Sequence, residues 1–163
     1  MKIKFFTKAN FFCSVLILLI FFLDRFSKFQ ILKMLENKNN IFINDFLNFN
    51  LVFNTGIGFG LLSLNESIYY NIITFIIFAV VLLLIYFLLK SEGLEKYSFS
   101  LIVGGALGNL YDRIFNKAVP DFIDLHFANF HWFSFNIADI FISFGIILMI
   151  LKEFVFKKKN NET

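Results

Sequence analysis

The residues Ile68–Leu89, IYYNIITFIIFAVVLLLIYFLL, decide the fold class of this chain. They form one continuous stretch of 22 residues in which only Asn71 is clearly polar. A helix needs roughly 20 consecutive, mostly apolar residues to cross the hydrocarbon core of a bilayer. This stretch therefore predicts a membrane-spanning helix over about 68–89.

Three further apolar stretches predict spans at about 9–28, 97–114 and 137–156, the third of the four being the least hydrophobic. The composition agrees, because 58% of the 163 residues are hydrophobic and only 17% are charged, against about 25% charged in soluble domains. The prediction is an all-α membrane protein with four transmembrane helices. We expect one membrane-embedded domain over residues 1–163.

The distribution of basic residues predicts the orientation of these helices in the membrane. Lysines gather in the amino-terminal tail, in the short connection after the second span and in the carboxyl-terminal tail, all on one side of a four-span protein. The positive-inside rule places that side, and so both termini, in the cytoplasm. The first span lacks a small-x-small cleavage site, so we expect an uncleaved anchor rather than a signal peptide.

Two longer connections, about 38–66 and 115–135, then lie on the outer side. In the first of them, residues 48–54 alternate apolar and polar side chains with the period of a β-strand. Glycines at 56, 58 and 60 follow this strand and permit a turn or a close backbone approach. We expect the segment 38–66 to act as a lid over a substrate.

Polar side chains gather near the outer ends of three of the spans. Ionisable groups inside spans are rare and mark functional sites by default, and helical spacing of three or four residues brings these groups onto common faces. The alternatives are snorkelling anchors for Lys28 and Arg25, a structural ion pair for Asp112 and Arg113, and simple helix packing for the glycines. The candidates are Asp24, Lys28, Gly108, Asn109, Asp112, Arg113, Asn136 and Asp139.

Several chemistries have no support in the sequence. His126 and His131 lie in the second outer connection, read as a loop, without a Cys, a His-Glu-x-x-His motif or a third ligand, so we expect no metal site. Cys13 lies deep in the first span with no base beside it. No cofactor and no nucleic-acid partner are expected. Carboxylate chemistry is left, in which two neighbouring aspartates hold one proton between them, and spacing leaves Asp24, Asp112, Asp121, Asp124 and Asp139 all eligible.

Five motifs in order resemble those of bacterial lipoprotein signal peptidases, the type II signal peptidases. They are Asp24-Arg-Phe-Ser-Lys28, Asn54-Thr-Gly-Ile-Gly-Phe-Gly60, Gly104-Gly-Ala-Leu-Gly-Asn-Leu-Tyr-Asp-Arg113, Val119-Pro-Asp-Phe122 and Phe135-Asn-Ile-Ala-Asp139. The resemblance implies an aspartyl endopeptidase of the bacterial inner membrane. It would cut prolipoproteins just before a diacylglyceryl-modified Cys. It also implies a small β-sheet on the outer side, and we expect a monomer surrounded by membrane lipids.

The resemblance also implies roles for single residues. Asp121 and Asp139 become the catalytic pair, Asp124 a neighbour rather than a catalyst, and Asp112 a support. Arg113 and Asn54 are expected to touch the substrate backbone. The residues that shape or orient the site are then Asp24, Lys28, Gly108, Asn109 and Asn136.

The chain departs from the family pattern at a few positions. Arg25 stands where Gln is common, Lys117 where Gly is usual, and Pro120 where an aliphatic residue is usual. Ile57-Gly58 and Ile140 also differ from the usual residues. A small proton-coupled exporter is the alternative from another class, although it would carry its acid in mid-span rather than at the end of a helix.

Overall fold

The structure is a computed structural model that describes residues 7–36, 38, 40–56, 67–128 and 130–161. Its order of elements is helix, hairpin, two helices, hairpin, helix. The elements are α1 (Lys8–Met34), β1 (Asn40–Asn44), β2 (Leu47–Asn54), α2 (Ser67–Lys90), α3 (Gly93–Phe115), β3 (Val119–Phe127), β4 (Phe130–Phe135) and α4 (Ile137–Asn161).

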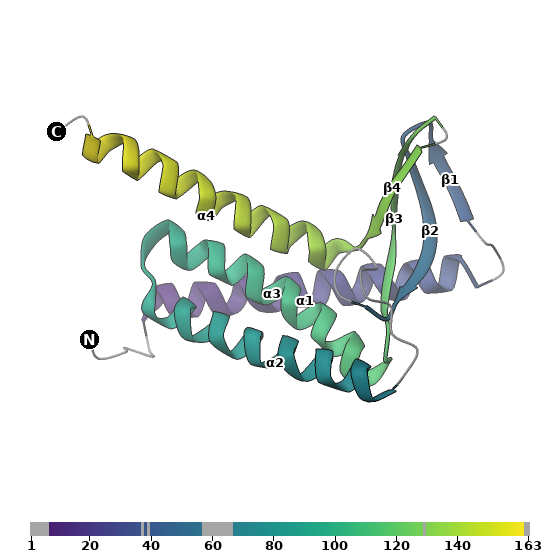
Figure 1. Cartoon of the computed structure of the whole chain (residues 1–163), viewed down its shortest axis with the longest axis horizontal. Coiled ribbons are helices and arrows are strands. Elements are labelled where there is room, and N and C mark those ends of the chain that lie inside the picture. The colour runs from purple at the N-terminus through teal and green to yellow at the C-terminus, as the bar shows by residue number, and fades with distance from the viewer. Residues whose placement is uncertain (1–6, 37, 39, 57–66, 129, 162–163) are drawn as a thin grey trace.

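The four helices run up and down beside one another, with the sheet at one end of the bundle (Figure 1). Helix α3 is central and packs against α1, α2 and α4. The start of α1 and the end of α4 lie at the end of the bundle opposite the sheet (Figure 1). The polar residues near the second end of α1, the second end of α3 and the start of α4 are therefore all at the sheet end.

Two of the four helices, α1 and α2, are long and apolar enough to cross a membrane by length and composition. Most of their apolar surface faces outward, since only 17% and 11% of the residues in their most apolar windows are buried. Helices α3 and α4 do not pass the same test over the described residues. For α3 the reason is its central position, because its buried face carries small and polar residues, such as Ser98, Ser100 and Gly104, that let neighbouring helices approach.

The sheet is antiparallel with the strand order β1-β2-β3-β4. The strand predicted over 48–54 is confirmed as β2, and a sheet is present as expected. The expected β region of 38–66 was too narrow, however, because the connection 115–135 forms β3 and β4 instead of a loop. The register between these two strands shifts between Asp124 and His126, so the simple alternation that marks a strand is interrupted there.

Helix α1 extends past the predicted span 9–28 as far as Met34, as the amphipathic pattern of residues 29–36 indicates, and supports the sheet. Ile31 and Leu35 form a buried cluster with Phe122 of β3, and Phe49 and Leu51 of β2 pack against it. Phe122 is the neighbour of Asp121 in the chain. The last turns of α1 thus fix the part of β3 that carries a predicted site residue.

Candidate active site

Asp121 is the third residue of β3, an inner strand of the sheet, and is 3% exposed. Asn54, the last residue of β2, donates from Nδ2 to one carboxylate oxygen at 3.0 Å. Asn136, between β4 and α4, donates from Nδ2 to the other oxygen at 2.6 Å. Each oxygen of this buried carboxylate is therefore held by a side-chain amide, which fixes its orientation.

Asp139 lies in the first turn of α4 and closes a reciprocal cap with Asn136. The backbone N–H of Asp139 donates to Oδ1 of Asn136 at 3.1 Å, and the backbone N–H of Asn136 donates to Oδ2 of Asp139 at 3.2 Å. This is the arrangement of a capping box, in which two residues three apart satisfy each other's free N–H groups. The other oxygen of Asp139 accepts from Nδ2 of Asn109 at 2.8 Å. The carboxylate is thus fixed by its own helix and by α3.

Asn136 joins the two aspartates, because its side chain bonds to Asp121 while its backbone bonds to Asp139. The two carboxylates also interact electrostatically. Burial, followed by the negative charge of Asp139, raises the pKa of Asp121 from 3.8 to about 6. Two neighbouring carboxylates, one of which has a pKa of about 6, can hold one proton between them near neutral pH.

Beneath Asp139, a buried ionic cluster joins α1 to α3. Lys28, 2% exposed, donates from Nζ to Asp24 at 2.9 Å, to Asp112 at 2.8 Å and to Oδ1 of Asn109 at 2.9 Å. Because Asn109 uses its amide N–H on Asp139, Lys28 fixes which way this amide points. Asp24 also accepts the backbone N–H of Ala138 at 3.1 Å. The cluster therefore positions the first turn of α4 through two independent contacts.

Arg25 completes this cluster, a role that the sequence did not predict. Its guanidinium donates to both oxygens of Asp112, at 2.6 Å and 2.5 Å, and to Asp24 at 2.8 Å. Two cations and two carboxylates then form a group with no net charge, which a buried site requires. The interpretation of Arg25 as a snorkelling anchor is wrong, because its side chain is only 19% exposed and turns inward. A charged residue next to Asp24 was the available signal.

Gly108 allows α1 and α3 to approach at this level. A Cβ atom at this position would lie 2.6 Å from Oδ2 of Asp24. Any side chain here would displace a carboxylate that contacts Lys28, Arg25 and the α4 backbone. The close approach of two helices, which the glycines predicted, thus makes room for the Asp24 side chain between α1 and α3.

Arg113 lies apart from the contacts that join the aspartates. It is 6% exposed, and its Nη1 atom is buried without a hydrogen-bond partner in the described part of the chain. The hydroxyl of Tyr70 donates to the Arg113 carbonyl at 3.0 Å, which ties α2 to the end of α3. The lid proposed for 38–66 falls partly on residues 57–66, which lie outside the described residues. Its described part, 40–54, forms β1 and β2 of the sheet.

A groove with a volume of about 390 Å³ opens beside Asp139. Its walls come from β4 and from the outward face of α4. They are apolar apart from Asp139 and Ser143, and they include Trp132, Phe133, Phe144 and Ile147. The groove can therefore take an apolar group and hold it next to one of the two carboxylates.

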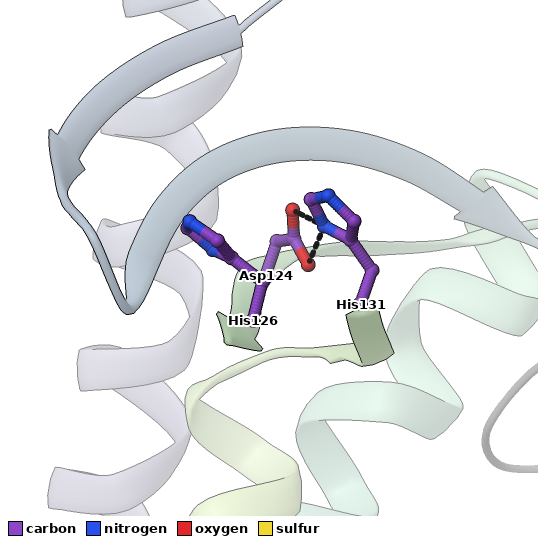
Figure 2. Close-up of side chains that lie close together, drawn as sticks. All are labelled: Asp124, His126 and His131. Atoms are coloured by element: carbon purple, nitrogen blue, oxygen red, sulfur yellow. Dashed lines mark hydrogen bonds and ion pairs between the residues drawn. The ribbon is translucent and has the colours of Figure 1, made fainter. Parts of the chain in front are cut away.

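Among the described residues, Asp124 contacts His131 rather than Asp121 or Asp139. Both of its oxygens lie within 3.1 Å of Nδ1 of His131. The expectation of no metal site rested on the lack of a Cys, of a His-Glu-x-x-His motif and of a third ligand. The structure supplies such a ligand, because suitable atoms of Asp124, His126 and His131 lie within 4.8 Å of one another (Figure 2).

Comparison with known proteins gives the same family as the motifs. Residues 16–155 match the family described as signal peptidase (SPase) II. The chain belongs to this family. It is 50% identical over 157 residues to a lipoprotein signal peptidase of Pelagibacter ubique (strain HTCC1062). The aligned residues cover 94% of this chain and 95% of that protein. A lipoprotein signal peptidase of Francisella tularensis subsp. novicida (strain U112) is 40% identical over 151 residues, 90% of this chain and 93% of that protein.

Two solved structures share the fold. One bacterial membrane enzyme has a TM-score of 0.74 and 30% identity, over 93% of this chain and 91% of that chain. A second bacterial membrane enzyme structure has a TM-score of 0.65 and 29% identity, over 86% of this chain and 90% of that chain. Signal peptidase II is a family of aspartic peptidases of bacterial membranes, so the predicted family, enzyme class and membrane environment are confirmed.

Proposed function

We propose that Asp121 and Asp139 are the pair with which this member of the signal peptidase II family cleaves the signal peptide from prolipoproteins. The observation that carries the assignment is Asn136. One residue holds both carboxylates, and it does so with two different groups. The elevated pKa of Asp121, about 6, gives the pair the mixed protonation that peptide hydrolysis needs.

In this mechanism, the ionised member of the pair takes a proton from water, and the oxygen of that water attacks the carbonyl carbon before the lipid-modified Cys. The protonated member donates a hydrogen bond to the carbonyl oxygen as it becomes negatively charged. When the C–N bond breaks, a proton passes to the leaving amine, and the pair again holds one proton. Asn54, Asn109 and Asn136 keep the carboxylates still throughout, so no reorganisation is needed at the transition state.

The apolar groove beside Asp139 supports a substrate that carries acyl chains. A diacylglyceryl group is apolar, and the groove is lined almost entirely by apolar side chains of β4 and α4. In this proposal the modified Cys enters sideways from the outer leaflet of the inner membrane, with its acyl chains against Trp132 and Phe144. Arg113, whose Nη1 is buried and unpartnered among the described residues, and Asn54 contact the substrate backbone.

All four helices cross the inner membrane in this proposal, with both termini in the cytoplasm and the sheet outside. The lysines in the two tails and in the turn between α2 and α3 support this orientation. The start of α1 and the end of α4 also lie at the end of the bundle opposite the sheet (Figure 1). We propose a single-domain monomer surrounded by lipid. The exporter alternative is weakened further, because Asp24, the acid of α1, is fully buried and held by Lys28 and Arg25.

The direct test is cleavage of a diacylglyceryl-modified prolipoprotein by the purified chain and by Asp121→Asn and Asp139→Asn. A general acid or base contributes about 10²–10⁴-fold to the rate, so each variant should lose at least that factor. Asp45→Asn changes an exposed acid in the β1–β2 turn and is the matched control. Cleavage by either pair variant at the rate of this control would contradict the assignment.

A further inference from the structure

Asp124, His126 and His131 form a second polar cluster on the sheet (Figure 2). Asp124 and His126 lie on β3, and His131 lies opposite His126 on β4. The register shift between Asp124 and His126 turns His131 toward the carboxylate two residues away from its own partner. Two imidazoles and one carboxylate thereby converge from two paired strands.

Among the described residues, no lysine or arginine pairs with the carboxylate of this cluster. Asp124 is 4% exposed, and among the described residues His131 is the side chain that bonds to it, at 2.9 Å and 3.1 Å. A neutral imidazole satisfies a hydrogen bond but does not balance a buried carboxylate. The ring of His126 stacks on that of His131 at 5.0 Å, and its Nδ1 atom is buried with no hydrogen-bond partner in the described ranges. A buried carboxylate and a buried ring nitrogen without a partner among the described residues thus lie close together.

We propose that these three residues bind a divalent transition-metal ion, of which Zn²⁺ is the best match. Zn²⁺ takes imidazole nitrogen and carboxylate oxygen at about 2.0–2.2 Å, which in a tetrahedral site puts ligand atoms roughly 3.3 Å apart. The distances from Nδ1 of His131 to Asp124 already approach this value. The candidate ligand atoms of all three residues lie within 4.8 Å of one another, and the side chain of His131, 53% exposed, has room to rotate as the ion draws them closer. The fourth position then faces solvent and takes water.

The bound ion would tie β3 to β4 close to the active site without taking part in the chemistry. Asp124 follows Asp121 on the same strand, and β4 leads directly into Asn136. One of the two strands that meet at the metal therefore carries Asp121 near its start, and the other ends next to Asn136. The site is independent of the proposed peptidase reaction, because none of its three residues contacts Asp121 or Asp139 through a hydrogen bond within the described part of the chain.

The sequence makes a clean test possible, because the chain has only two histidines. The full chain, purified in detergent micelles with a tag that contains no histidine, is labelled with ¹⁵N-histidine and titrated with ZnCl₂. One equivalent of Zn²⁺ should shift the imidazole signals of both rings, and MgCl₂ should shift neither, because Mg²⁺ prefers oxygen ligands. Unchanged signals, or a shift of one ring alone, would overturn the proposal.

Variants supply a second readout that does not depend on cleavage. Zn²⁺ should raise the Tm of the unmodified chain, because it binds the folded state. This rise should disappear in His131→Ala and Asp124→Asn and persist in Glu153→Gln, an exposed acid near the other end of α4. It should also disappear at pH 5, where protons compete for the imidazoles. A rise that survives in His131→Ala would show that the metal binds elsewhere.

Discussion

At the residue scale, burial and then the charge of Asp139 raise the proton affinity of Asp121. Since burial and this charge together raise the pKa of Asp121 to about 6, Asp139→Asn should lower it while burial keeps it above 3.8. The measurement is a ¹³C NMR titration of the labelled Asp121 carboxyl in the unmodified chain and in the variant. Asp45→Asn should leave the titration where it is. An unchanged midpoint in Asp139→Asn would mean that the two carboxylates do not interact.

The same pKa makes the stability of the fold depend on pH. Between about pH 4 and 6 the folded chain binds the Asp121 proton more tightly than the unfolded chain does, so this group's contribution to the free energy of unfolding falls as pH rises. It is largest below pH 4 and is lost above pH 6. The free energy of unfolding of the unmodified chain, relative to that of Asp121→Asn, should therefore decrease over this window. Denaturation in micelles at a series of pH values measures it, and a difference that grows with pH would refute the direction.

Arg25 replaces the Gln that is common in the family, and its contacts predict a stabilising role. Arg25→Gln would leave Asp24 and Asp112 with Lys28 as their one cationic partner among the described residues. Hydrogen bonds to charged groups are worth about 1.5–3 kcal/mol, so we expect the free energy of unfolding to fall by an amount in this range.

Arg25→Lys is the matched comparison for this prediction. It keeps the charge but loses the two-pronged contact with Asp112, so its stability should lie between those of the unmodified chain and Arg25→Gln. Equal stability of all three proteins in chemical denaturation would show that the extra cation contributes nothing.

Most of the residues that meet in the site could be predicted from the sequence. The hydrogen bonds that join them could not. The spacing of Asn109 and Asp112, and of Asn136 and Asp139, indicated shared faces at one level of the bundle. That Asn136 binds both aspartates, or that Asp24 reaches a backbone N–H of α4, depends on how three helices pack. Contacts of this kind, between separate helices, produce no periodic pattern in the sequence of a single chain.

At the element scale, the cap of α4 and the geometry of the aspartates depend on the same residue. Asn136→Ala removes the N-cap acceptor and the donor to Asp121 together. Loss of an N-cap typically destabilises a protein by about 0.5–2 kcal/mol, and the released carboxylates should also lower kcat.

Asn136→Ser separates these two effects. A serine hydroxyl caps a helix well but is too short to replace the amide donor to Asp121, so stability should recover while kcat stays low. Thermal unfolding and single-turnover cleavage provide the two readouts. Recovery of kcat along with stability would mean that Asn136 serves only as a cap.

A second element-scale contact closes the turn between α2 and α3. Lys96, 6% exposed, donates from Nζ to the carbonyls of Leu88 and Ser91 at 2.9 Å and 3.0 Å, where the end of α2 leaves carbonyls free. Lys96→Met keeps the apolar stem and leaves those carbonyls unpaired, at a cost of about 1–3 kcal/mol. Lys33→Met, an exposed lysine in the last turn of α1, is the control. Equal Tm values for the two variants would contradict the capping role.

The strands differ in how well they could be predicted from the sequence. Residues 48–54 alternate apart from Val52, and β2 was predicted. The segment 119–135 was not predicted as strands, because it buries both faces at Val119–Phe122 and changes register before His126. The alternation is lost where both faces are covered and again where the bulge intervenes.

At the scale of the whole molecule, the orientation in the membrane can be tested with cysteines. Cys13 is the single cysteine of the chain and is fully buried, so Cys13→Ala gives a cysteine-free background. Asp45→Cys in the β1–β2 turn and Glu92→Cys between α2 and α3 then place one exposed thiol at each end of the bundle. A membrane-impermeant maleimide, applied to cells with a permeabilised outer membrane, should label position 45 and should reach position 92 only after lysis. Because the sheet carries Asp121, labelling of position 92 in intact cells would put the active site on the cytoplasmic side, where a substrate arriving from the outer leaflet could not reach it.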